Sequence, residues 1–427
     1  MSKLNLLRKV LSVLFLGLFL LGCKPARIRK EVTRQLENPF YNNQFTGLLV
    51  VNPKTKDTVF SYNADRYFTP ASNTKLFTLY TALKFLPDSI PAFKYSVIKD
   101  TLHLLGTGNP AFLHPYFQDS TALKFAGKYK NVNVILNNLD DDKYGPGWAW
   151  EDYDRYFSPE RSSFPVYGNV LSISNTNNSL QTTPAVFKEN VQVLQHSSQR
   201  AYNNNTFYYN PKRRDTIEVP MVLNPAVFDS LWQNILPGKV KITNYKGQKM
   251  DEVAYGMPSD TLYKRMMLVS DNFLAEQILI LSASTLSDTL SSKKIRANVL
   301  ETYLKDLKQK PRWVDGSGLS RYNLFTPLSF VQVLSKLYAD IPEDRLFNLF
   351  PVGGQSGTLK HYYSGKDRPY IYAKSGTVGN NYALSGYLLT NSGETLIFSF
   401  MNNHYTTSTK AVKQHMTQVF EWLRDNY

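Results

Sequence analysis

The sequence predicts an α+β protein in which strands from both ends of the chain form one sheet and helices occupy the region between them. Within residues 46–62, two apolar runs rich in β-forming residues flank the turn Asn52-Pro53, a pattern typical of a β-hairpin. A second hairpin is predicted for 382–389 and 395–400, followed by an amphipathic helix over 409–423. The C-terminal hairpin is therefore expected to complete the sheet that the first hairpin begins.

Apolar residues at helical spacing predict several helices between the two hairpins. The first runs from Ser72 to Lys84, and its apolar face is formed by Leu76, Leu79, Tyr80 and Leu83. Further helices are predicted over 268–282, 293–307 and 327–337. No internal repeat of the kind that builds solenoids is visible.

Length and composition indicate two domains. The chain has 427 residues, more than one hydrophobic core usually organises, and its 42% hydrophobic content is typical of globular proteins. Short β-like runs such as 132–136 and 170–173, separated by Asn, Asp, Pro and Ser, predict a β-rich inserted domain over 89–255. The remaining folded residues, 44–88 and 256–427, are expected to form the other domain.

The N-terminal residues have the layout of a bacterial lipoprotein signal. Lys3, Arg8 and Lys9 precede an apolar run over 10–21 that is too short to cross a membrane as a mature helix. The run ends at Leu-Leu-Gly-Cys23, which resembles the lipobox, where a cysteine is acylated and becomes the new N-terminus. Cys23 is the only cysteine, and the alternative that it is an inert buried thiol stays open.

These features predict a signal peptide over 1–22, lipidation at Cys23 and a polar tether over 23–43 that lifts the protein off a membrane. The protein is then expected in the bacterial cell envelope, lipid-anchored and exposed to the periplasm or cell wall. Removal of residues 1–22 takes away three positive charges and no negative charge, so the net charge falls from +15 to +12. One cysteine also excludes an intrachain disulfide.

The positive net charge does not indicate nucleic-acid binding. The basic residues are scattered, Lys212-Arg213-Arg214 is the densest internal cluster, and no nucleic-acid recognition module is visible. A solvated surface or attraction to anionic cell-wall polymers explains the charge more simply. The six histidines show neither a His-Glu-x-x-His motif nor paired spacing, so no metal and no cofactor is predicted.

Ser72-x-x-Lys75 places a hydroxyl and an amine on the same face of a predicted helix start. Such a serine becomes a nucleophile if the lysine takes its proton, which requires burial or neighbouring cations to lower the lysine pKa from about 10.4. The motif alone is weak, because Ser96 and Ser291 also begin Ser-x-x-Lys matches. Ser96 lies in a strand-like run, where residues three apart point to opposite faces, and Ser291 lies in a polar stretch expected to be exposed.

Two further motifs distinguish Ser72 from the other matches. Ser270-Asp-Asn272 opens a predicted helix and Lys374-Ser-Gly-Thr377 leads into the C-terminal hairpin, so a hydroxyl, a carboxamide and an ammonium can meet in one groove. Each motif has an ordinary alternative: Ser270 and Asn272 are good helix N-caps, and Lys374 could protect an edge strand from aggregation. Together and in this order, the three motifs resemble those of β-lactamases and penicillin-binding proteins.

Longer segments narrow this resemblance to one family. The chain resembles the low-molecular-mass class C penicillin-binding proteins, the D-alanyl-D-alanine carboxypeptidase/endopeptidases, at 68–75, 270–276, 315–321, 351–358 and 374–377. The inserted region resembles theirs at 106–110, 145–148 and 219–225. The resemblance implies a penicillin-binding protein/serine β-lactamase-like transpeptidase fold, with the β-rich domain inserted between the first and second motifs. The resemblance also implies that residues 44–88 and 256–427 together form the DD-peptidase catalytic domain.

The same resemblance implies a serine peptidase that cleaves a D-alanyl bond of peptidoglycan stem peptides through an acyl-enzyme and is acylated by β-lactam antibiotics. Ser72 would attack, Lys75 would act as the base, Ser270 would relay the proton and Asn272 would orient its neighbours. The residues that would bind the substrate are Lys374, Ser375, Gly376 and Thr377. Ser375 stands where the family usually has threonine, which keeps the hydroxyl. The gap of 198 positions between Ser72 and Ser270 is short for the family and predicts a reduced insert.

Asp140 resembles a position where the family reads the amino end of the stem peptide's diamino acid, although an aspartate run in a turn is also typical of a solvated loop. Two other functions stay open. A serine β-lactamase would share all three motifs but would need a deacylating base that the sequence does not show. A non-catalytic wall-binding lipoprotein would be expected to have lost motif residues, and none is lost.

Overall fold

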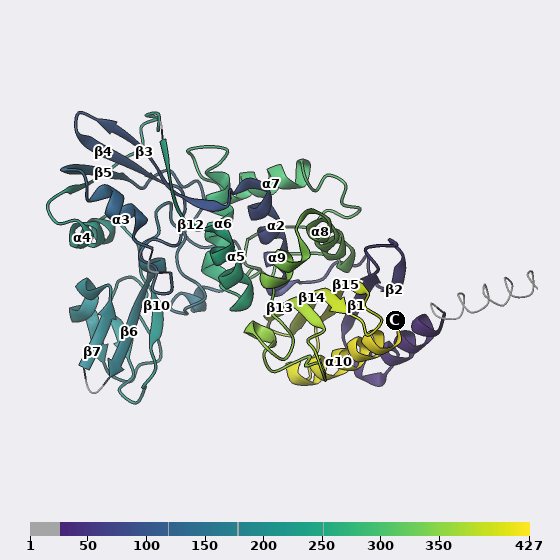
Figure 1. Cartoon of the computed structure of the whole chain (residues 1–427). Coiled ribbons are helices and arrows are strands. Elements are labelled where there is room, and N and C mark those ends of the chain that lie inside the picture. The colour runs from purple at the N-terminus through teal and green to yellow at the C-terminus, as the bar shows by residue number, and fades with distance from the viewer. Residues whose placement is uncertain (1–25, 118, 177–178, 251) are drawn as a thin grey trace, which may run out of the picture. The chain divides into compact units, whose positions relative to one another are not determined.

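The computed structural model of the chain describes residues 26–117, 119–176, 179–250 and 252–427 (Figure 1). The signal peptide predicted for 1–22 and the lipidation predicted at Cys23 lie outside these residues. Among the helices that the structure describes, none is both long and apolar enough to cross a membrane.

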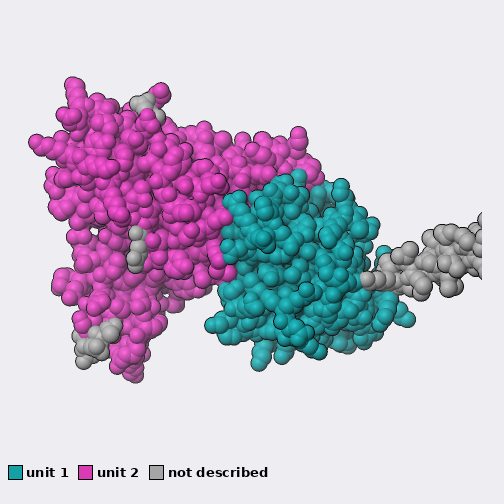
Figure 2. Space-filling view, viewed as in Figure 1, with its two compact units in different colours: residues 1–73, 308–311, 324–427 teal, residues 74–307, 312–323 magenta. Residues whose placement is uncertain are grey.

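The chain forms two compact units, coloured separately in Figure 2. Unit 1 contains the described residues up to 73 together with 308–311 and 324–427, and unit 2 contains 74–307 and 312–323. This division differs from the boundaries predicted at 88/89 and 255/256. The helices on either side of the inserted strands pack on one another, which groups them with the insert.

Unit 1 is built on a five-stranded antiparallel sheet. Its strand order is β13 (Ile371–Val378), β14 (Asn381–Leu389), β15 (Thr395–Asn403), β1 (Phe45–Val51) and β2 (Thr58–Tyr62). β1 pairs directly with β15, and Leu48 lies opposite Phe400. The prediction that the C-terminal hairpin completes the sheet of the N-terminal hairpin is therefore confirmed.

Helices cover both faces of this sheet, and the main ones are α8 (Pro327–Asp340) and α10 (Thr409–Asn426), with the short α9 (Glu343–Asn348) beside α8. On one face, Phe420 of α10 contacts Phe398 with ring centroids 4.6 Å apart. Side chains alternate along a strand, so Tyr387 points to the other face, and its hydroxyl donates a 3.0 Å hydrogen bond to the Leu334 carbonyl of α8. The sheet is thus buried on both sides.

The N-terminal helix, residues 26–36, packs on the core that α10 also covers. Ile28, Val32 and Leu36 recur every four positions, share one face of the helix and are buried in this core. The sequence predicts a tether for 23–43, whereas the structure has a packed helix in the middle of that segment. The charged residues between the three apolar positions conceal the pattern.

Unit 2 combines helices with three sheets whose strand orders are β11-β5-β4-β3-β12, β10-β6-β7 and β8-β9. The strands are β3 (Ser89–Ile98), β4 (Thr101–Gly106), β5 (Asn131–Ile135), β6 (Val170–Thr176), β7 (Ser179–Thr183), β8 (Val191–Val193), β9 (Phe207–Tyr209), β10 (Ile217–Pro220), β11 (Val240–Thr243) and β12 (Glu252–Pro258). The helices are α2 (Lys75–Phe85), α3 (Thr121–Ala126), α4 (Pro225–Ile235), α5 (Ser259–Leu268), α6 (Asn272–Ala283) and α7 (Ser292–Glu301). These strands lie between the first and second motifs, as predicted for the β-rich insertion.

The helix predicted over 268–282 is α6, which begins four residues later than predicted, because a break separates it from α5. α5 ends at Leu268 and α6 begins at Asn272, and Ser270 between them has a left-handed backbone (φ 60°) that a helix cannot continue through. Neither α4 nor α5 is predicted from the sequence.

We expect Ile28→Ala to lower the free energy of unfolding of unit 1 by about 2–5 kcal/mol, because it removes a buried side chain and leaves a cavity. The adjacent, exposed Arg29 is the matched control, and Arg29→Ala should change the free energy by less than about 0.5 kcal/mol. Urea denaturation monitored by tryptophan fluorescence would measure both. Equal effects would show that the N-terminal helix does not stabilise the unit.

Candidate active site

Ser72 lies in a short 3-10 helix, Ala71–Thr74, that runs directly into α2. Ala71 has a left-handed backbone (φ 48°), which non-glycine residues rarely adopt and which clusters at functional sites. Ser72 is partly exposed, whereas Lys75, the first residue of α2, is fully buried. The motif therefore joins an accessible hydroxyl to a desolvated amine along one helical path.

The amine of Lys75 is held by two hydrogen bonds within unit 2. Its Nζ donates to Oδ1 of Asn272 and to the carbonyl oxygen of Ser317, each at 2.7 Å. Asn272 opens α6, and its Nδ2 donates to the Phe157 carbonyl at 3.2 Å, which orients the amide. Two of the predicted site residues, distant in sequence, are therefore in direct contact.

Burial lowers the pKa of Lys75 from 10.5 to about 8, because the buried ammonium loses its hydration. The carboxylates of Asp315, Asp271 and Glu276 act in the opposite direction and keep the pKa from falling further. An amine that titrates near this value is partly neutral at physiological pH. It can accept a proton from a hydroxyl nucleophile.

Asp315 organises the loop that carries the Ser317 carbonyl. Its buried carboxylate accepts four hydrogen bonds, from the backbone of Gly318 (2.8 Å) and Ser320 (2.7 Å) and from the side chains of Asn323 (2.7 Å) and Trp148 (2.9 Å). Four donors satisfy the carboxylate and fix the loop around it. The loop in turn presents the Ser317 carbonyl to Lys75.

Glu276 and Arg161 form a buried ion pair that supports the same loop. Glu276 Oε1 accepts a 2.7 Å hydrogen bond from the Ser317 backbone, and its Oε2 lies 3.5 Å from Arg161 Nη1, with the two side chains 1% and 3% exposed. Burial raises the pKa of Glu276, the nearby Asp315 carboxylate raises it further, and Arg161 opposes both.

The sequence alone predicts no role for either Glu276 or Arg161. A charged residue inside the otherwise apolar α6 was the signal that could have found Glu276, since such residues are almost never buried without a partner. No local pattern marks Arg161.

Asp271, rather than Ser270 or Asn272, caps α6. Its side chain accepts a 3.0 Å hydrogen bond from the Leu274 backbone. The N-cap alternative for Ser270 and Asn272 is therefore wrong. Ser270 instead occupies the strained position between α5 and α6, where its left-handed backbone is of the kind found at functional sites.

In unit 1, the third motif lies on β13, an edge strand of the sheet. Lys374 is buried and its Nζ donates to the Ser375 carbonyl at 2.7 Å, so it does not have the exposure of a lysine that protects an edge from aggregation. The Ser375 hydroxyl lies 2.6 Å from that of Thr358, and Thr377 is exposed. The strand thus carries an ammonium and two hydroxyls within four residues.

Gly376 brings this strand against the turn that holds Ser72. A Cβ on Gly376 would lie 2.6 Å from the Pro70 carbonyl oxygen and 2.8 Å from the Ser72 backbone nitrogen, so only glycine fits there. The neighbouring Asn73 donates a 2.8 Å hydrogen bond from Nδ2 to the Ser385 hydroxyl in β14. Within unit 1, Ser72 and the third motif are therefore adjacent.

The remaining candidates lie elsewhere in unit 2. Asp140 forms an exposed ion pair with Lys294, in which Oδ2 and Nζ are 3.2 Å apart and the side chains are 56% and 71% exposed. Ser96 lies in β3, as its strand-like pattern predicts. Ser291 precedes α7 at the N-cap position and is only 3% exposed, so the expectation of an exposed stretch is wrong for this residue.

The sequence profile of the D-Ala-D-Ala carboxypeptidase 3 (S13) family matches residues 28–224 and 226–426. The chain belongs to this family. It is therefore a hydrolase of the serine-type D-Ala-D-Ala carboxypeptidase class, as the resemblance of its motifs implies. It is similar to the D-alanyl-D-alanine carboxypeptidase DacB of Haemophilus influenzae, with 22% identity over 438 residues that cover 89% of this chain and 90% of the relative.

Solved structures of other proteins share the fold, including two from Haemophilus influenzae and Bdellovibrio bacteriovorus. Penicillin-binding protein 4 of Haemophilus influenzae matches with a TM-score of 0.71 and 19% identity, covering 92% of this chain and 99% of that one. A penicillin G-acylated predatory endopeptidase of Bdellovibrio bacteriovorus, in complex with an immunity protein, matches with a TM-score of 0.50 and 14% identity, covering 88% and 93%. The predicted penicillin-binding-protein fold is confirmed.

We expect Arg161→Ala to destabilise unit 2 by about 3–5 kcal/mol, because it leaves the Glu276 carboxylate buried without its cation. Arg213 is the matched control, since its ion pair with Asp215 is exposed, with side chains 40% and 61% accessible. Arg213→Ala should cost at most about 1 kcal/mol. Urea denaturation would compare the two, and a loss at Arg161 no larger than at Arg213 would contradict a structural role for the buried pair.

Proposed function

We propose that this enzyme cleaves the D-alanyl-D-alanine bond of peptidoglycan stem peptides through an acyl-enzyme at Ser72, as a carboxypeptidase and endopeptidase. The observation that carries the proposal is the state of Lys75. Its amine is buried, has a pKa lowered to about 8, is held at 2.7 Å by Asn272 and the Ser317 carbonyl, and follows Ser72 by three residues. A serine needs such a base within reach to become a nucleophile.

In the proposed acylation, neutral Lys75 accepts the hydroxyl proton as Ser72 Oγ attacks the carbonyl carbon of the penultimate D-alanine. The tetrahedral intermediate then expels the amine of the terminal D-alanine, which receives the proton from Lys75 through Ser270. An ester to Ser72 replaces the peptide bond. Water then attacks the ester, gives a proton to Lys75 and releases the shortened peptide with Ser72 restored.

Two backbone amides of unit 1 are suited to an oxyanion hole. The Ser72 nitrogen lies 2.8 Å from the position of a Cβ on Gly376, next to the strand segment that carries the Thr377 amide. Elsewhere, an oxyanion-hole donor contributes roughly 2.7–4 kcal/mol. Lys374, with the hydroxyls of Ser375 and Thr377, would bind the terminal carboxylate.

A β-lactam would follow the same path as far as the ester. It presents a strained amide to Ser72 and a carboxylate to Lys374, and its ring fragment stays attached after acylation, where it blocks the approach of water. The penicillin G-acylated state of the Bdellovibrio bacteriovorus relative supports this part of the proposal.

The proposal places the enzyme in the bacterial cell envelope, anchored by lipid on Cys23 and exposed to the periplasm or cell wall. The lipobox-like sequence before Cys23 supports the anchor. Asp140 is proposed to bind the free amine of the stem peptide's diamino acid. Because Asp140 pairs with Lys294, the substrate ammonium would replace a cation that already occupies this position.

Intact-protein mass spectrometry after exposure to penicillin should show one adduct, located on the peptide that contains Ser72 and lasting many minutes. Ser72→Ala should abolish the adduct together with D-alanine release from peptidoglycan, because it removes the nucleophile. Ser96→Ala and Ser291→Ala, which alter the other two Ser-x-x-Lys matches, should leave both intact. Rapid destruction of the drug would favour a β-lactamase, and an unmodified wild type without D-alanine release would favour a wall-binding protein.

The rate of penicillin acylation should rise with pH by about tenfold per unit and level off above about 8, because only the neutral form of Lys75 is a base. Asp271→Asn keeps a good N-cap but removes a carboxylate that raises the pKa of Lys75, so the midpoint should move to lower pH. Asp229→Asn, on the exposed surface of α4, is the control and should leave the midpoint unchanged. A midpoint that does not move in Asp271→Asn, or that moves to higher pH, would contradict the assignment of Lys75 as the base.

A further inference from the structure

The surface of the N-terminal helix that faces away from the core carries a group of cations. The buried face consists of Ile28, Val32 and Leu36. The exposed residues on the remaining surface include Arg27, Arg29, Lys30 and Arg34. Three of these, Arg27, Lys30 and Arg34, are spaced three and four residues apart and therefore share one side of the helix.

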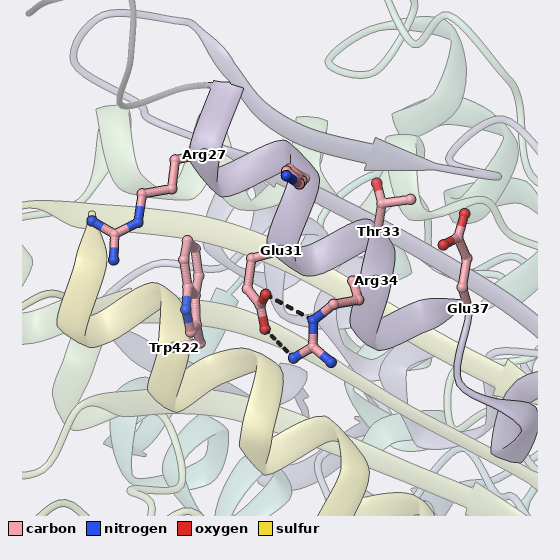
Figure 3. Close-up of a pocket in the computed structure, with 7 residues that line it drawn as sticks. Arg27, Glu31, Thr33, Arg34, Glu37 and Trp422 are labelled. Carbon is pink, nitrogen blue, oxygen red and sulfur yellow. Dashed lines mark hydrogen bonds and ion pairs between the residues drawn. The ribbon is translucent and has the colours of Figure 1, made fainter.

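This side of the helix borders an open pocket of about 490 Å³ whose lining includes Arg27, Lys30, Arg34 and Trp422 of α10. Figure 3 shows the Trp422 ring beside Arg27, with the Glu31–Arg34 pair on the other side of the ring. Glu31 is bound by Arg34 through two contacts of 2.6 and 2.9 Å, so these two charges cancel. Glu37 also lines the pocket, so the lining carries three cations and two carboxylates and is net positive. Within the described part of the chain, Arg27 and Lys30 take part in no ion pair.

Trp422 adds an apolar component to this surface. It is packed against the core on one side and only partly buried. An aromatic ring with a polar N–H, next to cations, is the combination that proteins place at the level of lipid headgroups. The pocket therefore offers both charge and an amphipathic ring to the same ligand.

The covalent chain limits how far this surface can lie from Cys23. The N-terminal helix begins at residue 26, three residues after Cys23, and three residues span at most about 11 Å. Charges are screened over about 8 Å at physiological ionic strength. With lipid on Cys23, the start of this helix is therefore held at a distance from the membrane surface that is comparable to the screening length.

We infer that Arg27, Lys30 and Trp422, beside the Glu31–Arg34 pair, form a docking surface for anionic phospholipid headgroups, by which unit 1 rests directly on the membrane. The membrane as the occupant rests on the proposed lipidation of Cys23, whereas the charge and shape of the surface do not. Phosphate groups of the headgroups complement the cations, and the acyl boundary complements the Trp422 ring. Binding of this kind weakens as salt screens the charges.

The test uses the mature chain from residue 23 with Cys23→Ser, so that no acyl chain contributes to binding. It is sedimented with vesicles of phosphatidylcholine, with or without phosphatidylglycerol, at low and high salt. We expect binding to the phosphatidylglycerol vesicles at low salt and its loss at high salt. A double variant, Arg27→Ala with Lys30→Ala, should bind about 25-fold more weakly, because each juxtamembrane cation contributes roughly fivefold.

The matched control removes two cations from the densest internal basic cluster, which lies in unit 2. Lys212→Ala with Arg214→Ala takes the same charge from exposed positions and should leave vesicle binding nearly unchanged. Equal losses in both double variants would overturn the inference, because overall charge would then explain the binding. Retention of penicillin acylation shows that each variant is folded, and the single charge reversal Lys30→Glu provides a second test with the same expected direction.

Two further outcomes would overturn the inference. One is equal binding to vesicles with and without phosphatidylglycerol. The other is binding of a soluble polyphosphate polymer that matches vesicle binding and is lost in the same double variant, which would assign the surface to an anionic wall polymer.

The anchor is separable from the docking surface by washing cell membranes that contain the wild-type protein. If salt releases the protein without detergent and vesicle binding is selective, the lipid anchor is contradicted and the docking surface is supported. If the protein stays in the membrane until detergent is added and does not bind vesicles, the lipid anchor is supported and the docking surface is contradicted. In the second case, Cys23→Ser should abolish retention in the membrane fraction.

Discussion

A lysine amine removed from bulk water needs hydrogen-bond acceptors in fixed positions, and the surroundings of Lys75 supply them. Asn272 can accept from it because Asp271 takes over the capping of α6 and leaves the amide to face the lysine. The Ser317 carbonyl can accept because Asp315 gathers the loop around its own carboxylate. Each hydrogen-bond acceptor of the Lys75 amine is thus held in place by a second interaction that does not involve the amine.

The electrostatics of this region follow from opposing effects, of which desolvation is the largest. Desolvation favours the neutral amine, and three nearby carboxylates favour the ammonium, so the pKa settles near 8. Burial and Asp315 raise the pKa of Glu276, and Arg161 opposes both and offsets the charge of the Glu276 carboxylate. The buried ion pair therefore has a bearing on chemistry although neither member touches the nucleophile. In unit 1 the corresponding constraint is steric, since the backbone contact at Gly376 fixes the distance from β13 to the Ser72 turn.

The sequence predicted those parts of the molecule whose pattern is local. β1, β2, β14, β15 and α10 have regular apolar spacing, and the three motifs place reactive groups at short, recognisable distances along the chain. The pairing of Arg161 with Glu276 joins residues 115 positions apart and leaves no trace in either neighbourhood. The N-terminal helix was hidden by composition, because only every fourth residue faces the core and the cations between them suggest a solvated segment. The break at Ser270 depends on a backbone angle that side-chain periodicity does not encode.

The pairing of β1 with β15 affects how the protein is made. Phe45 lies opposite Asn403, so the middle of the sheet joins the first strand of the chain to the last one. A sheet whose partners are so distant in sequence forms slowly and only after nearly the whole polypeptide has been synthesised. Until then β1 and β2 are a bare hairpin, which is marginally stable in water.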